Sequence, residues 1–164
     1  MPGFSTKMLK YIFEHDIILK NRQTRNNFMV KEIVRDMFFL SQPSVAAQTS
    51  DSSIADDLLD TLKANSERCV GLAANMIGAK KCILVFDDNG TYTEMFNPKI
   101  IKASGEYEAE EGCLSLDGVR KTKRFKTIKV EWQTRDGKPK IKTFSGFSAQ
   151  IIQHEIDHFS GKII

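Results

Sequence analysis

The feature that most constrains this chain is a pair of histidines near its C-terminal end, in His154-Glu155-Ile156-Asp157-His158. Histidine is scarce, with three in 164 residues, and segment 147–159 has the apolar spacing of a helix. Residues four apart share one helix face, so both imidazoles can reach one metal ion. Glu155 then lies about a quarter turn away, where a general base acting on water belongs. The pattern predicts a metal-binding helix; the alternative is a helix whose histidines are only packed or solvated.

The rest of the chain must bring further ligands to this helix. A catalytic metal site takes a third protein ligand and keeps one position open. The six residues after His158 contain no His, Cys, Asp or Glu, and the longer metzincin pattern meets Ile164 where it needs a histidine. We therefore expect the third ligand upstream, among the carboxylates and His15, Cys69, Cys82 and Cys113. Packing explains Cys69 and Cys82, whereas Cys113, which follows a glycine, stays open as a ligand.

Length, composition and charge narrow the class of protein. A chain of 164 residues with 41% hydrophobic and 27% charged residues is typical of one compact globular domain. No apolar run approaches the roughly 20 residues that span a bilayer, and no signal peptide is readable. Three cysteines are too few for a secreted disulfide scaffold. We expect a soluble, cytoplasmic protein with no membrane partner.

The net charge of +3 is confined to one end of the chain. Residues 1–28 carry five basic and two acidic side chains, so residues 29–164 are neutral overall. A neutral domain has no field that would draw it to DNA, and we expect no DNA partner. We predict an N-terminal extension over residues 1–28 that is not part of the domain, and a catalytic domain over residues 29–164.

Local patterns in this domain predict an α+β fold. A helix is expected over residues 54–66, with Ser53 as its cap and Asp56 completing a capping-box-like pattern. Asn89-Gly90 between two apolar runs predicts a hairpin, and Asp136-Gly137 predicts a second hairpin over residues 127–144. Antiparallel strands would then pack around the C-terminal metal-binding helix.

Three segments, taken in order and spacing, resemble the signature motifs of the peptide deformylase family. The similarity runs from about Val34 to the C-terminus, and its opening includes Leu40-Ser41-Gln42-Pro43. The third motif agrees down to the Gln before the first His and the Asp before the second. The three motifs are Gly71-Leu72-Ala73-Ala74, Glu111-Gly112-Cys113-Leu114-Ser115 and Gln153-His154-Glu155-Ile156-Asp157-His158.

The resemblance implies an enzyme that removes the formyl group from the N-terminal formyl-methionine of nascent chains. It implies Fe²⁺ bound by Cys113, His154 and His158, with Zn²⁺, Ni²⁺ or Co²⁺ as substitutes. It makes Glu155 the general base, and gives the backbone N–H of Leu114 to the oxyanion.

The resemblance also implies how substrate is bound. The substrate backbone would add a strand beside Gly71 and Glu111. The remaining residues implied around the methionine side chain and the pocket mouth are Val70, Phe147, Ile151 and Arg120.

The first motif departs from the family pattern G-x-G-x-A-A-x-Q. Cys69 stands at the first glycine, and Met76 stands at the glutamine that donates to the oxyanion. A thioether cannot donate, and losing one such donor typically costs roughly 100- to 1,000-fold in kcat. Asn75 would supply a substitute amide if the loop rotated by one residue. The departure keeps two alternatives open: an amidase with another acyl substrate, and a catalytically weakened paralogue that binds formyl-peptides or metal.

The strongest basic cluster is the run from Arg120 to Lys126. We interpret it as a solvated loop or strand edge, with a transient ribosome contact as the alternative.

Overall fold

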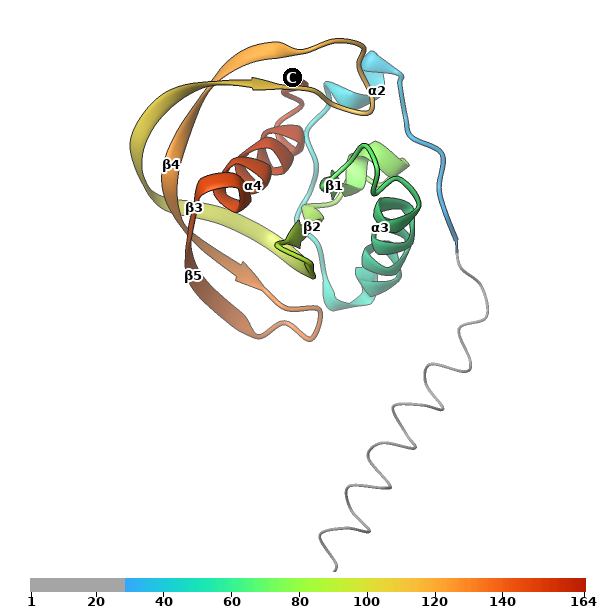
Figure 1. Ribbon diagram of the computed structural model, residues 1–164. Helices are drawn as coiled ribbons and strands as arrows, with labels where there is room; N and C mark the ends of the chain where they lie inside the picture. Colours follow the sequence, from blue (N-terminus) through green and yellow to red (C-terminus); the bar gives the residue numbers. More distant parts are fainter. Residues whose placement is uncertain (1–28) are drawn as a thin grey trace, which may run out of the picture.

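The structure is a computed structural model that describes residues 29–164 (Figure 1). The predicted extension, residues 1–28, lies outside the described residues. The elements follow in this order: α2 (Met37–Leu40), the 3-10 turn η1 (Thr49–Asp51), α3 (Ser52–Ala64), β1 (Gly71–Ala73), the 3-10 turn η2 (Ala74–Ile77), β2 (Ile83–Asp88), β3 (Thr91–Glu111), β4 (Arg120–Gln133), β5 (Pro139–Ser145) and α4 (Gly146–Phe159).

The five strands form one antiparallel sheet in the order β1-β2-β3-β4-β5. β3 pairs with β2 along its first residues and with β4 along the rest. Its register with β4 shifts between Phe96 and Lys99 and again between Ile100 and Lys102. Such bulges bend a strand and increase its twist, and Figure 1 shows β3 and β4 curving around α4. The predicted α+β fold, with antiparallel strands around the C-terminal helix, is confirmed.

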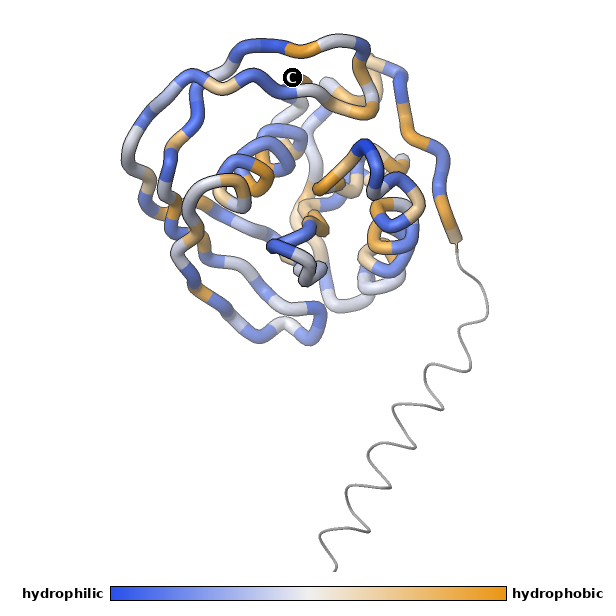
Figure 2. Tube along the Cα trace, viewed as in Figure 1, coloured by the Kyte–Doolittle hydropathy of each residue, from blue (hydrophilic) through white to orange (hydrophobic). Residues whose placement is uncertain are grey.

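Strand β2 carries both halves of the hydrophobic core. Ile83 and Val85 belong to the cluster that includes α3, while Leu84 and Phe86 belong to the cluster that includes α4. Side chains alternate across a strand, so both faces of β2 are buried over its first four residues, Ile83 to Phe86, which form an unbroken apolar run. Figure 2 shows the matching orange segments on α3 and α4, with hydrophilic residues along much of β5.

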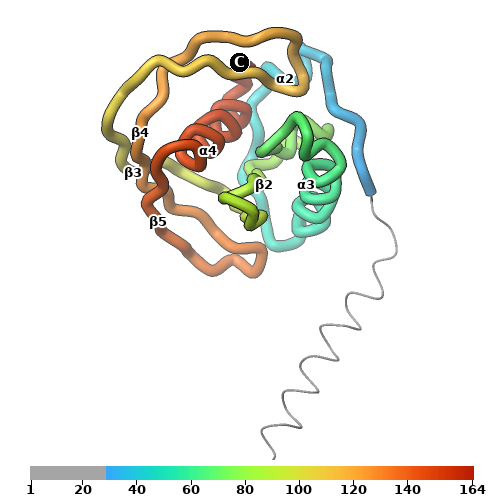
Figure 3. Tube along the Cα trace, in the orientation of Figure 1, coloured from blue at the N-terminus to red at the C-terminus, as the bar shows by residue number. Residues whose placement is uncertain are grey.

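The end of α4 is fastened to the segment that follows α2 (Figure 3). The Ser44 N–H donates to the Phe159 carbonyl at 2.8 Å. Gly161 has φ +78°, and a Cβ there would collide with the Ser41 carbonyl. A glycine is therefore required at this crossing, which fixes the C-terminal end of α4.

Both hairpins form where the sequence predicts them. Asn89 (φ 54°) and Gly90 (φ 92°) connect β2 to β3 with the positive φ angles of a type I′ turn. The β4–β5 connection contains Asp136-Gly137, and α4 begins within one residue of the predicted helix.

The predicted start of the first long helix is wrong. α3 begins at Ser52, directly after η1, so Ser53 already lies inside the helix. A capping box is present, but Gln48 and Asp51 make it at the start of η1. The 3-10 turn moves the first backbone N–H groups that lack a helical acceptor upstream, a shift that the apolar spacing does not reveal.

No helix over residues 29–164 is long and apolar enough to cross a membrane.

Candidate metal centre

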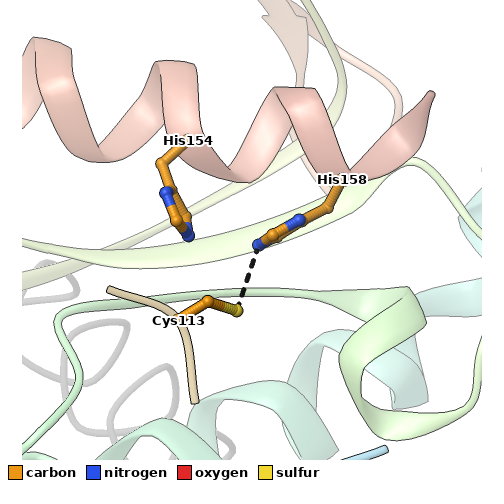
Figure 4. Close-up of side chains that lie close together, drawn as sticks. All are labelled: Cys113, His154 and His158. Carbon is orange, nitrogen blue, oxygen red and sulfur yellow. Dashed lines mark hydrogen bonds between the residues drawn. The ribbon is translucent and has the colours of Figure 1, made fainter. Parts of the chain in front are cut away.

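Helix α4 directs both of its histidines at the cysteine that follows β3 (Figure 4). The imidazole centroids of His154 and His158 lie 4.7 Å apart, and His158 Nε2 is 3.7 Å from Cys113 Sγ. One ligand atom from each of the three residues lies within 4.8 Å of the others, and all three residues are buried. Thiolate and imidazole are donors that suit Fe²⁺ or Zn²⁺. The chemistry and spacing of this set therefore fit a bound metal ion.

The outer nitrogen of each imidazole has its own partner. His154 Nδ1 donates to Glu111 Oε2 at 2.9 Å, and His158 Nδ1 donates to the Lys162 carbonyl at 3.1 Å. In the neutral imidazoles these bonds fix the tautomer in which Nε2 carries the free lone pair. Both rings are thus oriented to bind metal through Nε2.

A buried arginine holds the carboxylate behind His154. Arg124 Nε and Nη2 donate to the two oxygens of Glu111 at 2.8 and 2.7 Å, and Nη1 donates to Asp157 Oδ2 at 2.7 Å. Arg124 is 3% exposed. Burial raises the pKa of Glu111, but hydrogen bonds from His154 and Arg124 outweigh it and lower that pKa to about 2. Glu111 is therefore a fixed negative charge beside His154.

The two histidines differ in proton affinity. Burial lowers the pKa of His154, but its hydrogen bonds with Cys113 and Glu111 dominate and raise that pKa to about 10. Burial, together with the positive charge of His154, lowers the pKa of His158 to about 4. Metal binding requires neutral imidazoles, so the ion must displace the His154 proton.

Glu155 is set beside these ligands with a free oxygen. Its side chain is buried, burial raises its pKa to about 7, and the Ala73 N–H donates to it. Its Oε2 has no hydrogen-bond partner within the described chain and lies 4.0 Å from His158 Nε2. A Cβ on Gly71 would lie 2.8 Å from Glu155 Oε1, so only glycine lets β1 approach this closely. A carboxylate with a pKa near 7 suits proton transfer at neutral pH.

A pocket of about 210 Å³ opens beside these groups. Its apolar wall includes Phe147 and Val70, which are 62% and 38% exposed, and the buried Ile151. All but two of the predicted site residues line it: Val70, Gly71, Glu111, Cys113, Leu114, Phe147, Ile151, His154 and Glu155. His158 lies against Cys113 at its edge. The pocket can hold a small apolar side chain next to the candidate metal ligands.

Comparison with known proteins agrees with this geometry. The family model of polypeptide deformylase matches residues 29–164. A peptide deformylase of Clostridium beijerinckii is 56% identical over 136 residues, which cover 83% of this chain and all of the relative. The chain belongs to the polypeptide deformylase family. The predicted family and its activity, hydrolytic removal of the N-formyl group from nascent peptides, are confirmed.

Solved deformylases share the fold. A peptide deformylase from Legionella pneumophila superposes with a TM-score of 0.73 at 34% identity, covering 82% of this chain and 83% of that one. A Met-Ala-Ser-bound deformylase from Acinetobacter baumannii gives a TM-score of 0.71 at 26% identity, over 82% of this chain and 97% of that one.

The departures from the deformylase pattern lie at the pocket. Met76 is 2% exposed, lines the pocket, and has its Sδ 3.8 Å from Cys113 Sγ. Cys69 also lines the pocket, and its Sγ donates to the Gly71 carbonyl at 2.8 Å. The hypothesis that Asn75 replaces the missing amide is not supported, because its Nδ2 donates to the His158 carbonyl at 2.9 Å. That bond directs Asn75 to the end of α4 and away from the pocket lining.

Arg120 lies away from the pocket lining, whereas Glu111 lines the pocket. Arg120 is exposed, donates to the Asp117 carbonyl at 3.3 Å, and does not line the pocket. The Glu111 carboxylate is taken by Arg124 and His154, which leaves its backbone for substrate. Register explains the pair, because Glu111 and Arg120 lie opposite each other at the β3–β4 junction.

The basic run 120–126 forms the first half of strand β4, and the sequence analysis did not identify its buried member, Arg124. Lys123 forms an ion pair with Glu106 at 2.9 Å, and Lys121 lies opposite Glu110. Arg124 points inward, in phase with the buried Ile128 and Val130 further along β4. This alternation could have identified Arg124 from the sequence, because a charged residue on the apolar face of a strand needs a buried partner.

Proposed function

We propose that Cys113, His154 and His158 hold the catalytic metal of a formyl-methionine deformylase and that Glu155 moves the protons. The observation that carries this proposal is the buried Glu155 carboxylate, one oxygen of which has no hydrogen-bond partner among residues 29–164 and lies beside the three proposed ligands. A buried carboxylate oxygen without a hydrogen-bond partner is costly, and a packing role does not explain it. A reacting water would supply that partner.

The metal we propose is Fe²⁺, with Zn²⁺, Ni²⁺ or Co²⁺ as substitutes. One thiolate and two imidazoles disfavour Mg²⁺ and Ca²⁺, which take oxygen ligands. When bound, the ion supplies Lewis acidity to water and to the formyl oxygen.

The chain's own groups would carry out the proton transfers. Glu155 takes a proton from the attacking water and passes it to the leaving amine, which becomes the new N-terminus. Its pKa of about 7 balances both transfers. The Leu114 N–H, next to Cys113, donates to the oxyanion of the tetrahedral intermediate.

Substrate would bind as an added strand with its methionine in the apolar pocket. β1 is the edge strand of the sheet, and the last residues of β3 pair with β4 on one side. An extended peptide between Gly71 and the Glu111 backbone would use these edges. Val70, Phe147 and Ile151 would cover the methionine side chain, and Arg120 would lie outside the pocket, toward the mouth. The relative crystallised with Met-Ala-Ser supports this substrate class.

We infer a cytoplasmic enzyme that meets nascent chains, because newly made formylated peptides are its substrates. A transient ribosome contact would fall on the basic residues of β4. Their pairing with β3 glutamates, as in Lys123–Glu106, leaves this surface close to neutral, so the contact would be weak.

Anaerobic turnover of formyl-Met-Ala-Ser by Fe²⁺-loaded protein tests the proposal. Wild type should turn over, and the isosteric Glu155→Gln should lose at least about 100-fold in kcat with metal still bound. Met76→Gln should raise the rate, because it returns an oxyanion donor. An undiminished Glu155→Gln rate would contradict the role of Glu155.

Met76 favours a second candidate, a related amidase with another acyl group. Silence of wild type on formyl-Met-Ala-Ser, with turnover of N-acetyl- or N-propionyl-Met-Ala-Ser, would support it over deformylation.

A further inference from the structure

The thioether of Met76 lies beside Cys113, one of the three candidate metal ligands. η2 carries Met76 into the pocket wall, and the Val34 N–H donates to its backbone carbonyl at 2.9 Å. Its Sδ lies 3.8 Å from Cys113 Sγ in a buried contact. Two sulfur ligands of one tetrahedral ion, each with a bond of about 2.3 Å, lie about 3.8 Å apart. The two sulfurs therefore already have the separation of neighbours in one coordination shell.

The chemistry of the contact changes when metal binds. In the metal-free protein the Cys113 S–H can donate to the Met76 thioether, a weak acceptor. A metal-bound Cys113 is a thiolate and has no proton to donate. The Met76 thioether then no longer accepts a hydrogen bond from Cys113. Its lone pair is free to bind the ion that Cys113 holds. Thioether sulfur is a soft donor, suited to the ions that thiolate and imidazole select.

We propose that Met76 Sδ is a fourth, weak ligand of the metal bound by Cys113, His154 and His158. The set becomes two imidazoles, one thiolate and one thioether, a combination that favours soft ions. A bond to Met76, weaker than the bond to the Cys113 thiolate, would occupy the open position until water or substrate displaces it. The inference rests on the proposed function, since it requires the three ligands assigned there.

A packing role for Met76 is the alternative. Met76 belongs to the core cluster that includes Leu58, Leu62 and Leu72, and methionine often fills irregular gaps. Met76→Leu conserves volume and apolarity but removes the sulfur, so it separates the two roles. Met76→Gln is the second variant, because its amide ends at a similar reach with no sulfur.

X-ray absorption at the metal edge of the Zn²⁺-loaded full chain counts the sulfur neighbours. We expect two sulfurs in wild type and one in Met76→Leu and Met76→Gln. The same loss should lower Cd²⁺ affinity by about tenfold in a chelator competition, with a smaller change for Co²⁺. One sulfur in wild type, with Cd²⁺ affinity unchanged in Met76→Leu, would overturn the inference.

A selenium-edge measurement guards against a variant that fails to fold. In selenomethionyl wild type, one of the six selenium atoms should show a metal neighbour, and Zn²⁺ removal should abolish it. Absence of that neighbour rejects Met76 as a ligand. Cys113→Ser tests the foundation separately: it should remove one sulfur, and an unchanged sulfur count would reject the ligand set of the proposed function.

Discussion

Two arginines in this molecule make the same set of contacts in different surroundings. Arg124 donates hydrogen bonds from two guanidinium nitrogens to Glu111 and from the third to Asp157. Arg135 donates from two nitrogens to Glu94 and from the third to Asp56. The Arg124 and Glu111 side chains are 3% and 5% exposed, whereas those of Arg135 and Glu94 are 37% and 27% exposed. The Arg135 group connects α3 to β3, and the Arg124 group contacts Glu111, the carboxylate that binds the proposed metal ligand His154.

The difference in burial indicates what each arginine group contributes. An exposed ion pair adds about 0–1 kcal/mol, because water and salt screen it. A buried pair gives little net stability either, because desolvation offsets the attraction, but losing one partner is costly. Burial of Arg124 therefore makes sense through Glu111, whose fixed charge orients His154. The Arg135 group has no such link to the site.

Arg124→Met should produce the largest effect. It leaves the Glu111 carboxylate buried without its cation, and removing one partner of a buried pair costs about 3–5 kcal/mol. Urea unfolding with metal removed by chelator measures the loss. A loss below about 1 kcal/mol would mean that solvent screens the Arg124 group as strongly as the Arg135 group, and would contradict the distinction between them.

Lowering the pH should produce the second-largest effect on stability, through the Glu111 carboxylate of the Arg124 group. Because Glu111 has a folded-state pKa of about 2, below its ordinary 4.5, its stabilisation is present above pH 4.5 and is lost as pH falls toward 2. The shift corresponds to about 3 kcal/mol at most. Unfolding free energies of the metal-free protein between pH 6 and 2.5 measure it. Glu111→Gln should flatten this part of the pH dependence; an equally steep profile would contradict the assignment.

Glu111→Gln should weaken metal binding by about 10- to 100-fold, because an amide orients His154 without the negative charge. Chelator competition with Zn²⁺ measures the change. Glu94→Gln is the matched control in the exposed group and should leave metal affinity unchanged. Equal effects of the two variants would indicate a general electrostatic influence in place of a specific contact.

Arg135→Met should produce the smallest effect, about 1 kcal/mol or less, and high salt should reduce the difference from wild type. Deformylation should be unaffected, because Arg135 does not line the pocket. Urea unfolding at low and high salt, with turnover measured in parallel, checks both points. A large loss that salt does not reduce would show that Arg135 is packed more like Arg124.

Local signals explain which parts of the fold the sequence predicts. Asn89-Gly90 and the histidine spacing on α4 are patterns within a few residues, and both lead to the observed structure. The length of β3 and the burial of Arg124 depend on pairing between distant segments. A strand rich in Glu and Lys reads as a loop until its partner strand is known.

The candidate site divides in the same way. The family motifs bring together Cys113, His154, His158 and Glu155, and the geometry agrees with that grouping. The contact between Met76 and Cys113 joins residues 37 positions apart, so no local pattern contains it. Asn75 follows a different course from Met76, its neighbour in the sequence, because its side chain binds the His158 carbonyl at the end of α4. Adjacency in the sequence therefore does not predict a shared position in the pocket.

The two bulges near the middle of β3 have a consequence for assembly of the protein. β3 carries Glu94 near one end and Glu111 at the other, and the register shifts lie between them. A slip of one residue beyond the bulges would turn Glu111 outward and put Glu110 in its place. Glu110 would then present its carboxylate to Arg124 in place of Glu111, but Cys113 would move by about 3.3 Å, the rise of one strand residue, and the proposed metal site would not form. Metal binding would therefore stabilise only those chains in which β3 and β4, the two longest strands, pair in the observed register.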